Sequence, residues 1–343
     1  MPKISNQKKK YDINLALLRI YLSILVVNAH CLNIKNIRNK YLLKLLVNKL
    51  HCPIFFIISF YYCHNLFISK NIKKIKQRFE RLLLPYFLWP IIIWVLNNLI
   101  YFFFKKNLII TFNQLKIQIL TGHCFMTVLW FQYNLLFTTL LILIIQLLFK
   151  HNTILILINL WNISYFLQFS NINYKTFSKY SFFLKYSFGR FFEIFPYCIT
   201  GFIISSIKLI DRFKKYRIKT FYVIISFLVF VINNNIFVRI KGFMYQGINL
   251  YIASVSLFIV ISLIPLNTNN NDMIIVKMIK ILSSHTSGIY YLHVPIKNHL
   301  SNYILLIKKK TFIGCIIIFL FCYFISIIGI FFLKNTKLRH LFQ

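Results

Sequence analysis

Two side chains that are costly to remove from water lie in one long apolar stretch near the start of the chain. Arg19 and His30 belong to the run LRIYLSILVVNAH at 18–30. Eleven residues of α-helix make three turns plus about 20°, so we expect both side chains on one face, about 16 Å apart. Polar groups inside a bilayer usually face the protein interior or a wet cavity, where a histidine can act as a general base. The alternative is an arginine that reaches the headgroups and a histidine at the opposite interface.

A second polar pair, Arg78 and Arg81, lies at the start of another apolar run, RFERLLLPYFLW at 78–89. Residues three apart share a helical face, and two neighbouring guanidinium groups are well suited to bind phosphate. The spacing therefore predicts an anion-binding pair at the mouth of a membrane span. An ordinary positively charged flank of a membrane helix is the alternative interpretation.

Two further segments bring aromatic and polar side chains to the ends of apolar runs. Trp130 lies in VLWFQYNLL at 128–136, and Tyr290 and His293 lie in SHTSGIYYLHVPI at 284–296. Such aromatic residues usually form a belt at the membrane interface, but they can also line a substrate tunnel. We take Trp130, Tyr290 and His293 as candidate substrate or tunnel residues. Weaker candidates are the remaining polar groups within apolar runs, His285, Arg190 and Glu193.

Several common chemistries find no support in the sequence. It contains no GxGxxG, P-loop or HExxH motif. With only five Asp and Glu residues in the chain, catalysis led by carboxylates is not expected. The nine histidines lack the spacing of a zinc site, so we expect no metal.

The composition is that of a protein that crosses a membrane many times. Of the 343 residues, 59% are hydrophobic and only 13% are charged, whereas in soluble domains about a quarter of all residues are charged. The net charge of +36 is also compatible with a nucleic-acid binder. However, the basic residues lie between apolar runs without an aromatic platform, so we expect no nucleic-acid partner and instead attraction to anionic lipid.

The apolar runs predict an all-α bundle of about ten membrane spans in a single domain, 1–343, with no soluble domain. An even number of spans places both termini on one side, and the basic ends favour the cytoplasm, although the excess of positive charge inside is weak. Short basic joints are expected at 70–81 and 208–219, and an interfacial helix is possible in the longest outer joints, 105–128 and 171–187. The expected spans are 13–32, 52–69, 82–104, 129–149, 153–170, 188–206, 219–236, 247–265, 281–300 and 312–333.

The order of these motifs resembles the acyltransferase 3 family of integral membrane acyltransferases, over most of the chain. The resemblance rests on YDINLALLRIYLSILVVNAH with Arg19 and His30, PIFFIIS, the pair Arg78 and Arg81 followed by LLLPYFLW, LWFQYNLL, the segment near 195–203, and SGIYYLHVPI. Two positions differ from the family pattern, because Ile20 and Phe60 stand where members usually have glycine.

The resemblance implies an acyl transfer, often of acetyl from acetyl-coenzyme A, to hydroxyl groups of an envelope polysaccharide, a related glycan or a lipid-linked acceptor. It implies a protein of the cytoplasmic membrane, with membrane lipid around it. By the same resemblance His30 is the essential histidine, Arg19 its partner, and Arg78 with Arg81 the donor-binding pair.

Two other functions fit the composition and stay open on the sequence alone. About ten spans with a polar stripe also suit an exporter of a polysaccharide or glycolipid. A noncatalytic membrane partner of a glycan-synthesis complex would tolerate changes at both Arg19 and His30. The sequence names neither the acceptor nor the acyl chain.

Overall fold

The computed structural model describes residues 12–31, 50–68, 71–104, 110–122, 124, 126, 128–149, 152–169, 189–215, 225, 248–264, 273–301, 303–308 and 311–342. Within these ranges all regular structure is helical and no strand occurs. The predicted all-α fold is therefore confirmed for the described part of the chain.

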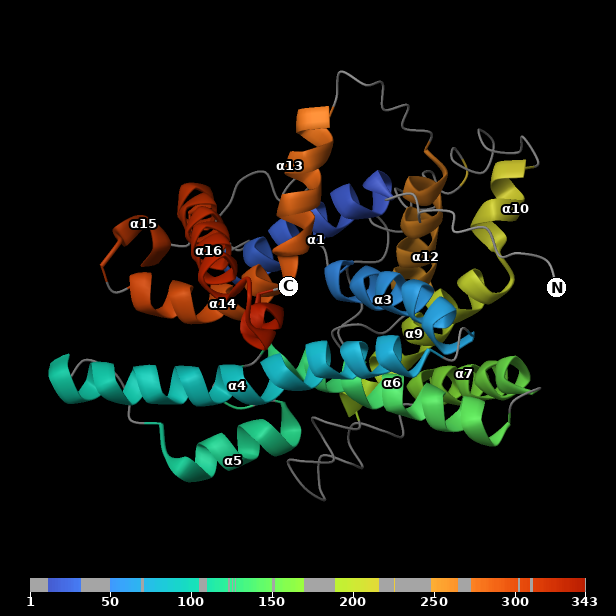
Figure 1. Cartoon of the computed structure of the whole chain (residues 1–343), viewed down its shortest axis with the longest axis horizontal. Coiled ribbons are helices and arrows are strands. Elements are labelled where there is room, and N and C mark those ends of the chain that lie inside the picture. Colours follow the sequence, from blue (N-terminus) through green and yellow to red (C-terminus); the bar gives the residue numbers. More distant parts are fainter. Residues whose placement is uncertain are drawn as a thin grey trace.

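Figure 1 shows the arrangement of the helices. Their bounds, in chain order, are α1 (Ile13–Cys31), α3 (His51–Ile68), α4 (Ile72–Phe104), α5 (Phe112–Thr121), α6 (Leu129–Leu148), α7 (Thr153–Phe169), α9 (Gly189–Ser206), α10 (Leu209–Lys215), α12 (Ile248–Leu263), α13 (Met273–Ser284), α14 (Thr286–Leu300), α15 (Leu305–Lys308), α16 (Phe312–Leu333) and the 3-10 helix η4 (Lys337–Leu341).

Most expected spans coincide with helices to within two residues, namely α1, α3, α6, α7, α9, α12 and α16. Four helices of the described segments, α1, α4, α6 and α16, are long and apolar enough to cross a membrane. The expected span at 219–236 lies outside the described residues, apart from Ile225. The total of about ten spans stays a prediction.

The basic segment that the sequence predicted as a joint at 70–81 is helical from Ile72 onward. Helix α4 runs without interruption from Ile72, although Pro85 and Pro90 lie inside it. Asn71 caps its first turn, because its side-chain oxygen accepts a hydrogen bond from the Lys74 amide at 3.1 Å. Lysine, glutamine, arginine and glutamate also favour helix. The arginine pair consequently lies on a rigid helix and not on a loop.

The region expected to form one span at 281–300 contains the end of one helix and the start of the next. Helix α13 ends at Ser284 and α14 begins at Thr286, with His285 between them. The expected helix within the joint 105–128 is present as α5, which Thr111 and Gln114 cap reciprocally.

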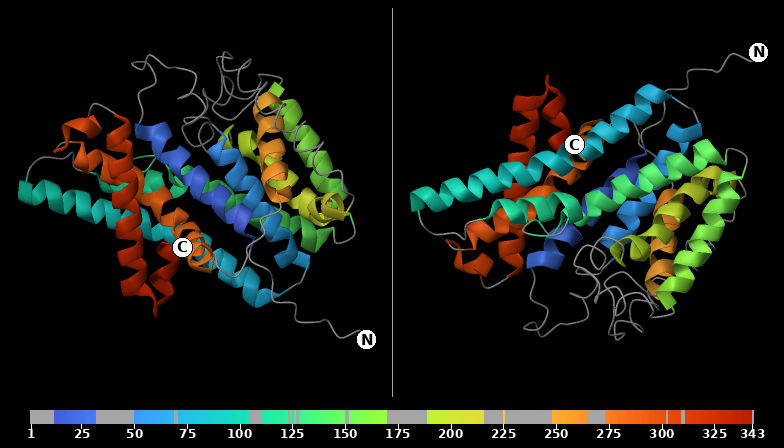
Figure 2. Two further views of the ribbon diagram at one scale, coloured as in Figure 1. Left: turned by 90° about the horizontal axis from the view of Figure 1, so that it is seen from above. Right: turned by 90° about the horizontal axis from the view of Figure 1, so that it is seen from below.

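Helices α3 and α9 pack against each other at a glycine. A Cβ atom at Gly201 of α9 would lie 2.3 Å from the carbonyl oxygen of Ile57 on α3, so glycine is required at this contact. Helix α1 lies beside α3 and also contacts α12, α13, α14 and α16, and Figure 2 shows it within the bundle. It therefore occupies a central position from which its polar residues can meet several other helices.

Helix η4, the last helix of the described chain, packs against α4 and α16. The indole Nε1 of Trp89 donates a hydrogen bond to the Leu341 carbonyl at 3.1 Å. The end of the described chain is thus fixed to the helix that carries the arginine pair.

Candidate functional site

A cavity of about 550 Å³ lies where α1, α3, α4, α6, α14 and η4 meet. Its size falls in the range of small-molecule sites. Aromatic and aliphatic side chains form part of the wall, including Phe55, Phe131 and Leu135. The polar part of the wall consists of Arg19, Ser59, Tyr62, Lys74, Gln77, Arg78, Arg81, Gln132, Thr286, Ser287, Tyr290, Tyr291 and His340.

The wall of this cavity is strongly basic. Arg19, Lys74, Arg78 and Arg81 all line it, together with His340, and the described lining includes no aspartate or glutamate. Like charges held together in a partly closed site repel one another unless an anion is present. The arrangement therefore favours an anionic ligand.

Arg78 is held in place by three neighbours from two helices. Its Nη2 donates hydrogen bonds to the hydroxyls of Ser59 at 3.1 Å and Thr139 at 3.3 Å. Its guanidinium carbon lies 5.5 Å from the centre of the Phe60 ring, a cation–π contact. Its buried Nε has no hydrogen-bond partner in the protein. A positioned guanidinium with a donor still available is suited to bind a phosphate oxygen.

The structure brings the three arginines that the sequence singled out to one cavity, although the sequence did not predict that Arg19 would join the other two. Arg78 and Arg81 line the same cavity, as their spacing on one helical face required. Arg19 lines it from α1, and its Nη2 donates a hydrogen bond to the Thr286 hydroxyl at 3.3 Å. With Tyr290, which also lines the cavity, four of the predicted site residues therefore meet at one surface.

His30 lies near this cavity without being part of its wall. Its ring centre is 5.0 Å from that of His293, whose ring centre is 6.0 Å from that of Tyr290. Tyr290 lines the cavity, so His293 and Tyr290 connect His30 to it. Because Arg19 contacts the start of α14 and His30 contacts its second turn, the two residues share the face of α1 that meets α14.

His293 is completely buried and only partly hydrogen-bonded. Its Nδ1 lies 3.0 Å from the Ile289 carbonyl, and since a carbonyl only accepts, Nδ1 carries the proton. Its Nε2 has no hydrogen-bond partner in the protein. This nitrogen is therefore a buried acceptor without a partner, on a ring whose centre lies 5.0 Å from that of His30. By contrast, His30 itself is exposed on the surface of the bundle.

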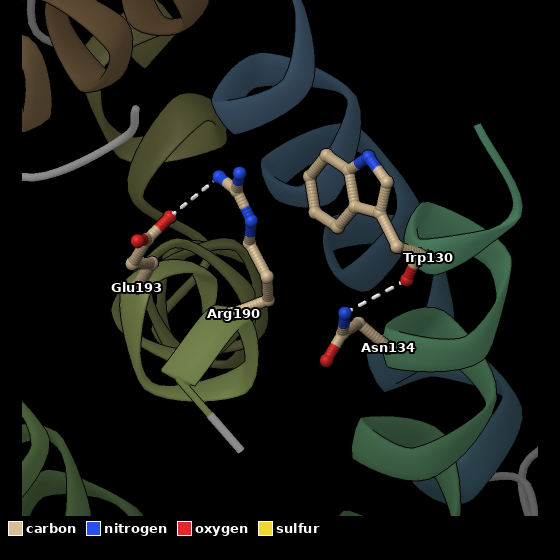
Figure 3. A network of polar contacts seen from close by, with 4 residues as sticks. All are labelled: Trp130, Asn134, Arg190 and Glu193. Carbon is tan, nitrogen blue, oxygen red and sulfur yellow. Dashed lines mark hydrogen bonds and ion pairs between the residues drawn. The ribbon is translucent and has the colours of Figure 1, made fainter. Parts of the chain in front are cut away.

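Trp130 takes part in a neighbouring polar cluster and does not line the cavity. Figure 3 shows the ring beside Arg190 of α9, whose guanidinium carbon is 5.4 Å from the ring centre. Arg190 forms an ion pair with Glu193 at 3.0 Å, and the side-chain amide of Asn134 donates to the Trp130 carbonyl at 2.7 Å. The cation–π contact joins α9 to α6, whereas the ion pair lies within α9 and the Asn134 hydrogen bond lies within α6.

Gln132, Tyr291 and His340 are cavity residues that the sequence did not single out. Gln132 donates to the Leu82 carbonyl at 2.9 Å and accepts from the Tyr291 hydroxyl at 2.6 Å. Gln132 could have been found from the sequence, because a glutamine inside an apolar run is unusual. No local pattern identifies His340, because it reaches the cavity only through the folding of the last residues back onto α4.

The cavity and its surroundings contain no grouping typical of a metal site. Within the described ranges, no three His, Cys, Asp or Glu side chains lie close enough together to hold a metal ion. His285, a weaker candidate from the sequence, is bonded within its own turn, with Nδ1 2.6 Å from the Ile281 carbonyl.

These features define the class of protein. It is helical, it has helices long and apolar enough to cross a membrane, and it has a basic cavity next to a histidine pair. Its sequence matches the Acyl_transf_3 family model, described as an acyltransferase domain, over residues 12–334. The chain belongs to this family, and it is a membrane acyltransferase by that membership. No curated protein and no solved structure gave a significant match.

Proposed function

We propose that the protein is an O-acyltransferase of the cytoplasmic membrane that moves an acyl group, in the first place acetyl, from acyl-coenzyme A to a hydroxyl of a cell-envelope polysaccharide or related glycan. The observation that carries this proposal is the basic cavity with Arg19, Arg78 and Arg81 in its wall, connected through Tyr290 and His293 to His30. Membership of the acyltransferase family supports the reaction class.

The chemistry of the cavity fits the donor. Coenzyme A carries phosphate groups at one end and a long, largely uncharged arm at the other. The guanidinium groups of Arg78 and Arg81 would hold the phosphates. The aromatic wall that includes Phe131 and Tyr290 offers a path for the arm toward His293 and His30.

His30 would act as the general base of the transfer. It accepts the proton of the acceptor hydroxyl while the oxygen attacks the thioester carbonyl carbon. As the new ester C–O bond forms, the C–S bond breaks. His30 then gives the proton that it had taken to the departing thiolate, so coenzyme A leaves as the free thiol. The exposed position of His30 allows a bulky acceptor to reach it without entering the cavity.

The proposal is tested by comparing membranes with wild type or His30→Ala at equal expression, for transfer of labelled acetyl from acetyl-coenzyme A into base-labile envelope ester. We expect the label to fall to background in the variant, because the base contributes about 10²–10⁴-fold. His299→Ala serves as the matched control, since His299 lies farther along α14 and does not line the cavity. Equal labelling in His30→Ala and wild type would exclude the assigned role of His30, and glycan export that survives the substitution would favour an exporter.

A further inference from the structure

The last described residues, 336–342, lie outside the family match, which ends at 334, yet one of them, His340, lines the cavity. They are firmly docked. Leu341 and Phe342 are buried, the Leu341 carbonyl accepts the hydrogen bond from Trp89, and the Phe342 ring lies 5.4 Å from the Trp89 ring, edge to face. The segment is thus a fixed part of the wall.

Two glycines on neighbouring helices leave room for this segment. A Cβ atom at Gly329 of α16 would lie 2.5 Å from the ring of Phe342, and one at Gly288 of α14 would lie 3.2 Å from its carbonyl oxygen. Neither contact requires an unusual backbone conformation. The two helices therefore form a slot that receives the end of the chain and fixes the position of the preceding residue, Leu341, and of His340.

His340 is the residue that this segment contributes to the cavity. It is half-buried and lines the cavity together with Arg78 and Arg81. Its Nδ1 is buried and has no hydrogen-bond partner in the protein. A buried polar atom without a partner is uncommon, and here it lies in a basic site. His340 thus brings an imidazole with one unsatisfied nitrogen to the cavity that Arg78 and Arg81 also line.

The charges around His340 determine its protonation state. Burial lowers the pKa of His340 below its ordinary value, Arg81 of α4 and Arg339 of η4 lower it further, and Glu80 of α4 opposes them. Helix α16, which also packs against η4, has no Asp, Glu, Lys, Arg or His from Phe312 to Leu333. The imidazole is therefore mainly neutral at neutral pH without a ligand.

We propose that His340 is a third phosphate ligand of the donor site, which acts together with Arg78 and Arg81. This inference rests on the proposed function, because it takes coenzyme A as the anion. A negatively charged phosphate next to the imidazole favours its protonated form. By linkage, protonation must then favour binding of the phosphate to the same extent. Donor binding consequently takes up a proton, and affinity increases as the pH falls.

The experiment measures binding of labelled coenzyme A to the purified full chain in lipid nanodiscs at pH 6, 7 and 8. We expect His340→Gln to weaken binding about 5- to 20-fold at pH 6, as for loss of a hydrogen bond to a charged group, and by less than about 2-fold at pH 8. The phosphate monoester of the ligand itself titrates near pH 6, so the comparison is between variants at each pH.

Two further variants separate the role of His340 from general effects. His340→Lys carries a permanent positive charge, so this variant should bind coenzyme A more tightly than wild type at pH 8. Its affinity should also lack the part of the pH dependence that His340 contributes. Lys337→Gln is the matched control, because it removes a positive charge from the same 3-10 helix at an exposed position outside the cavity wall, and its affinity should stay within about 2-fold of wild type.

The outcomes distinguish this inference from the proposed function. If Arg78→Gln weakens binding while His340→Gln and His340→Lys match wild type at every pH, the donor site stands and the role of His340 is overturned. If the wild type binds no coenzyme A, the proposed donor is wrong and the inference is overturned with it. A loss of pH dependence confined to the His340 variants supports both.

Discussion

At the scale of single residues, His293 links His30 to the cavity. It is completely buried, its Nδ1 is bonded to the Ile289 carbonyl, its Nε2 has no hydrogen-bond partner in the protein, and its ring centre lies 5.0 Å from that of His30. A buried acceptor of this kind can orient the imidazole of His30 as the latter gains a proton. We propose that His293 acts as a positioning residue for His30, since Tyr290, and not His293, lines the cavity.

For His293→Gln we expect kcat of acyl transfer to fall about 10- to 100-fold while KM for the donor changes less than about 2-fold. Glutamine restores hydrogen-bonding capacity, so gross unfolding is not expected. The measurement is steady-state transfer with acetyl-coenzyme A varied, and His299→Gln on the same helix serves as control. A change in KM alone, or none in either constant, would contradict the positioning role.

Arg78 illustrates why arginine and lysine are not equivalent in this site. Its guanidinium bonds to Ser59 and Thr139 at once and lies over the Phe60 ring. A lysine ammonium lacks the planar fork needed for all these contacts. Phe60, one of the two departures from the family pattern, is fully buried and supports this arrangement.

We accordingly expect Arg78→Lys to weaken coenzyme A binding about 10-fold, although the formal charge is unchanged. Lys76→Gln is a suitable comparison, because it removes a charge from an exposed position on the same helix and should leave affinity nearly unchanged. Affinities are measured by equilibrium binding in nanodiscs. Arg78→Lys with wild-type affinity would mean that charge alone, and not the fixed geometry, holds the phosphate.

At the scale of helices, the contact of α3 with α9 depends on the absence of one side chain. A Cβ at Gly201 would meet the Ile57 backbone, which cannot move independently of its helix, whereas a Cβ at Gly329 would meet the outer atoms of the Phe342 ring. The first clash requires two helices to separate, and the second only requires a ring to shift.

Gly201→Ala should therefore lower stability by about 1–3 kcal/mol, and Gly329→Ala by less. The measurement is the midpoint of thermal unfolding in one detergent, read by tryptophan fluorescence. Both substitutions place the same methyl group in a helix, so their intrinsic helix propensities cancel. An equal decrease of the unfolding midpoint in the two variants would show that the rigidity of the contacting atoms does not determine the loss of stability.

Helix positions were largely predictable from the sequence, whereas the site was predictable only in part. Apolar runs separated by lysine and asparagine locate helices such as α6 and α16. In lipid the backbone N–H and C=O groups of such a run must bond to one another, and a helix achieves this within one segment. The helical period also placed Arg78 and Arg81 on one surface.

Long-range packing accounts for what the sequence did not reveal. The start of α4 was missed because a basic segment before a span resembles a joint as much as a helix. The contact of His30 with His293 and the return of His340 to α4 each join residues far apart in the chain. No local period encodes such contacts, and the expected role of Trp130 in a tunnel stays a prediction.

At the scale of the whole molecule, the proposed function requires a particular orientation in the membrane. The proposed donor, acyl-coenzyme A, is made in the cytoplasm, so the proposal requires the basic cavity to open there and the proposed envelope acceptor to reach His30 from the other side. Helix α16 has 22 residues and is about 33 Å long, which is enough to cross the hydrocarbon core. The segment before it and the segment after it should then lie on opposite sides.

We expect Tyr303→Cys to react with a membrane-impermeant maleimide in intact cells, and Lys337→Cys to react only after permeabilisation. Both positions are exposed and lie on either side of α16. Six of the seven natural cysteines are buried and Cys124 is intermediate, so background labelling should be low. Labelling of Lys337→Cys in intact cells, with Tyr303→Cys protected, would place the cavity wall outside. Cytoplasmic coenzyme A could not then reach Arg78 and Arg81, and the donor would have to be an extracytoplasmic anion.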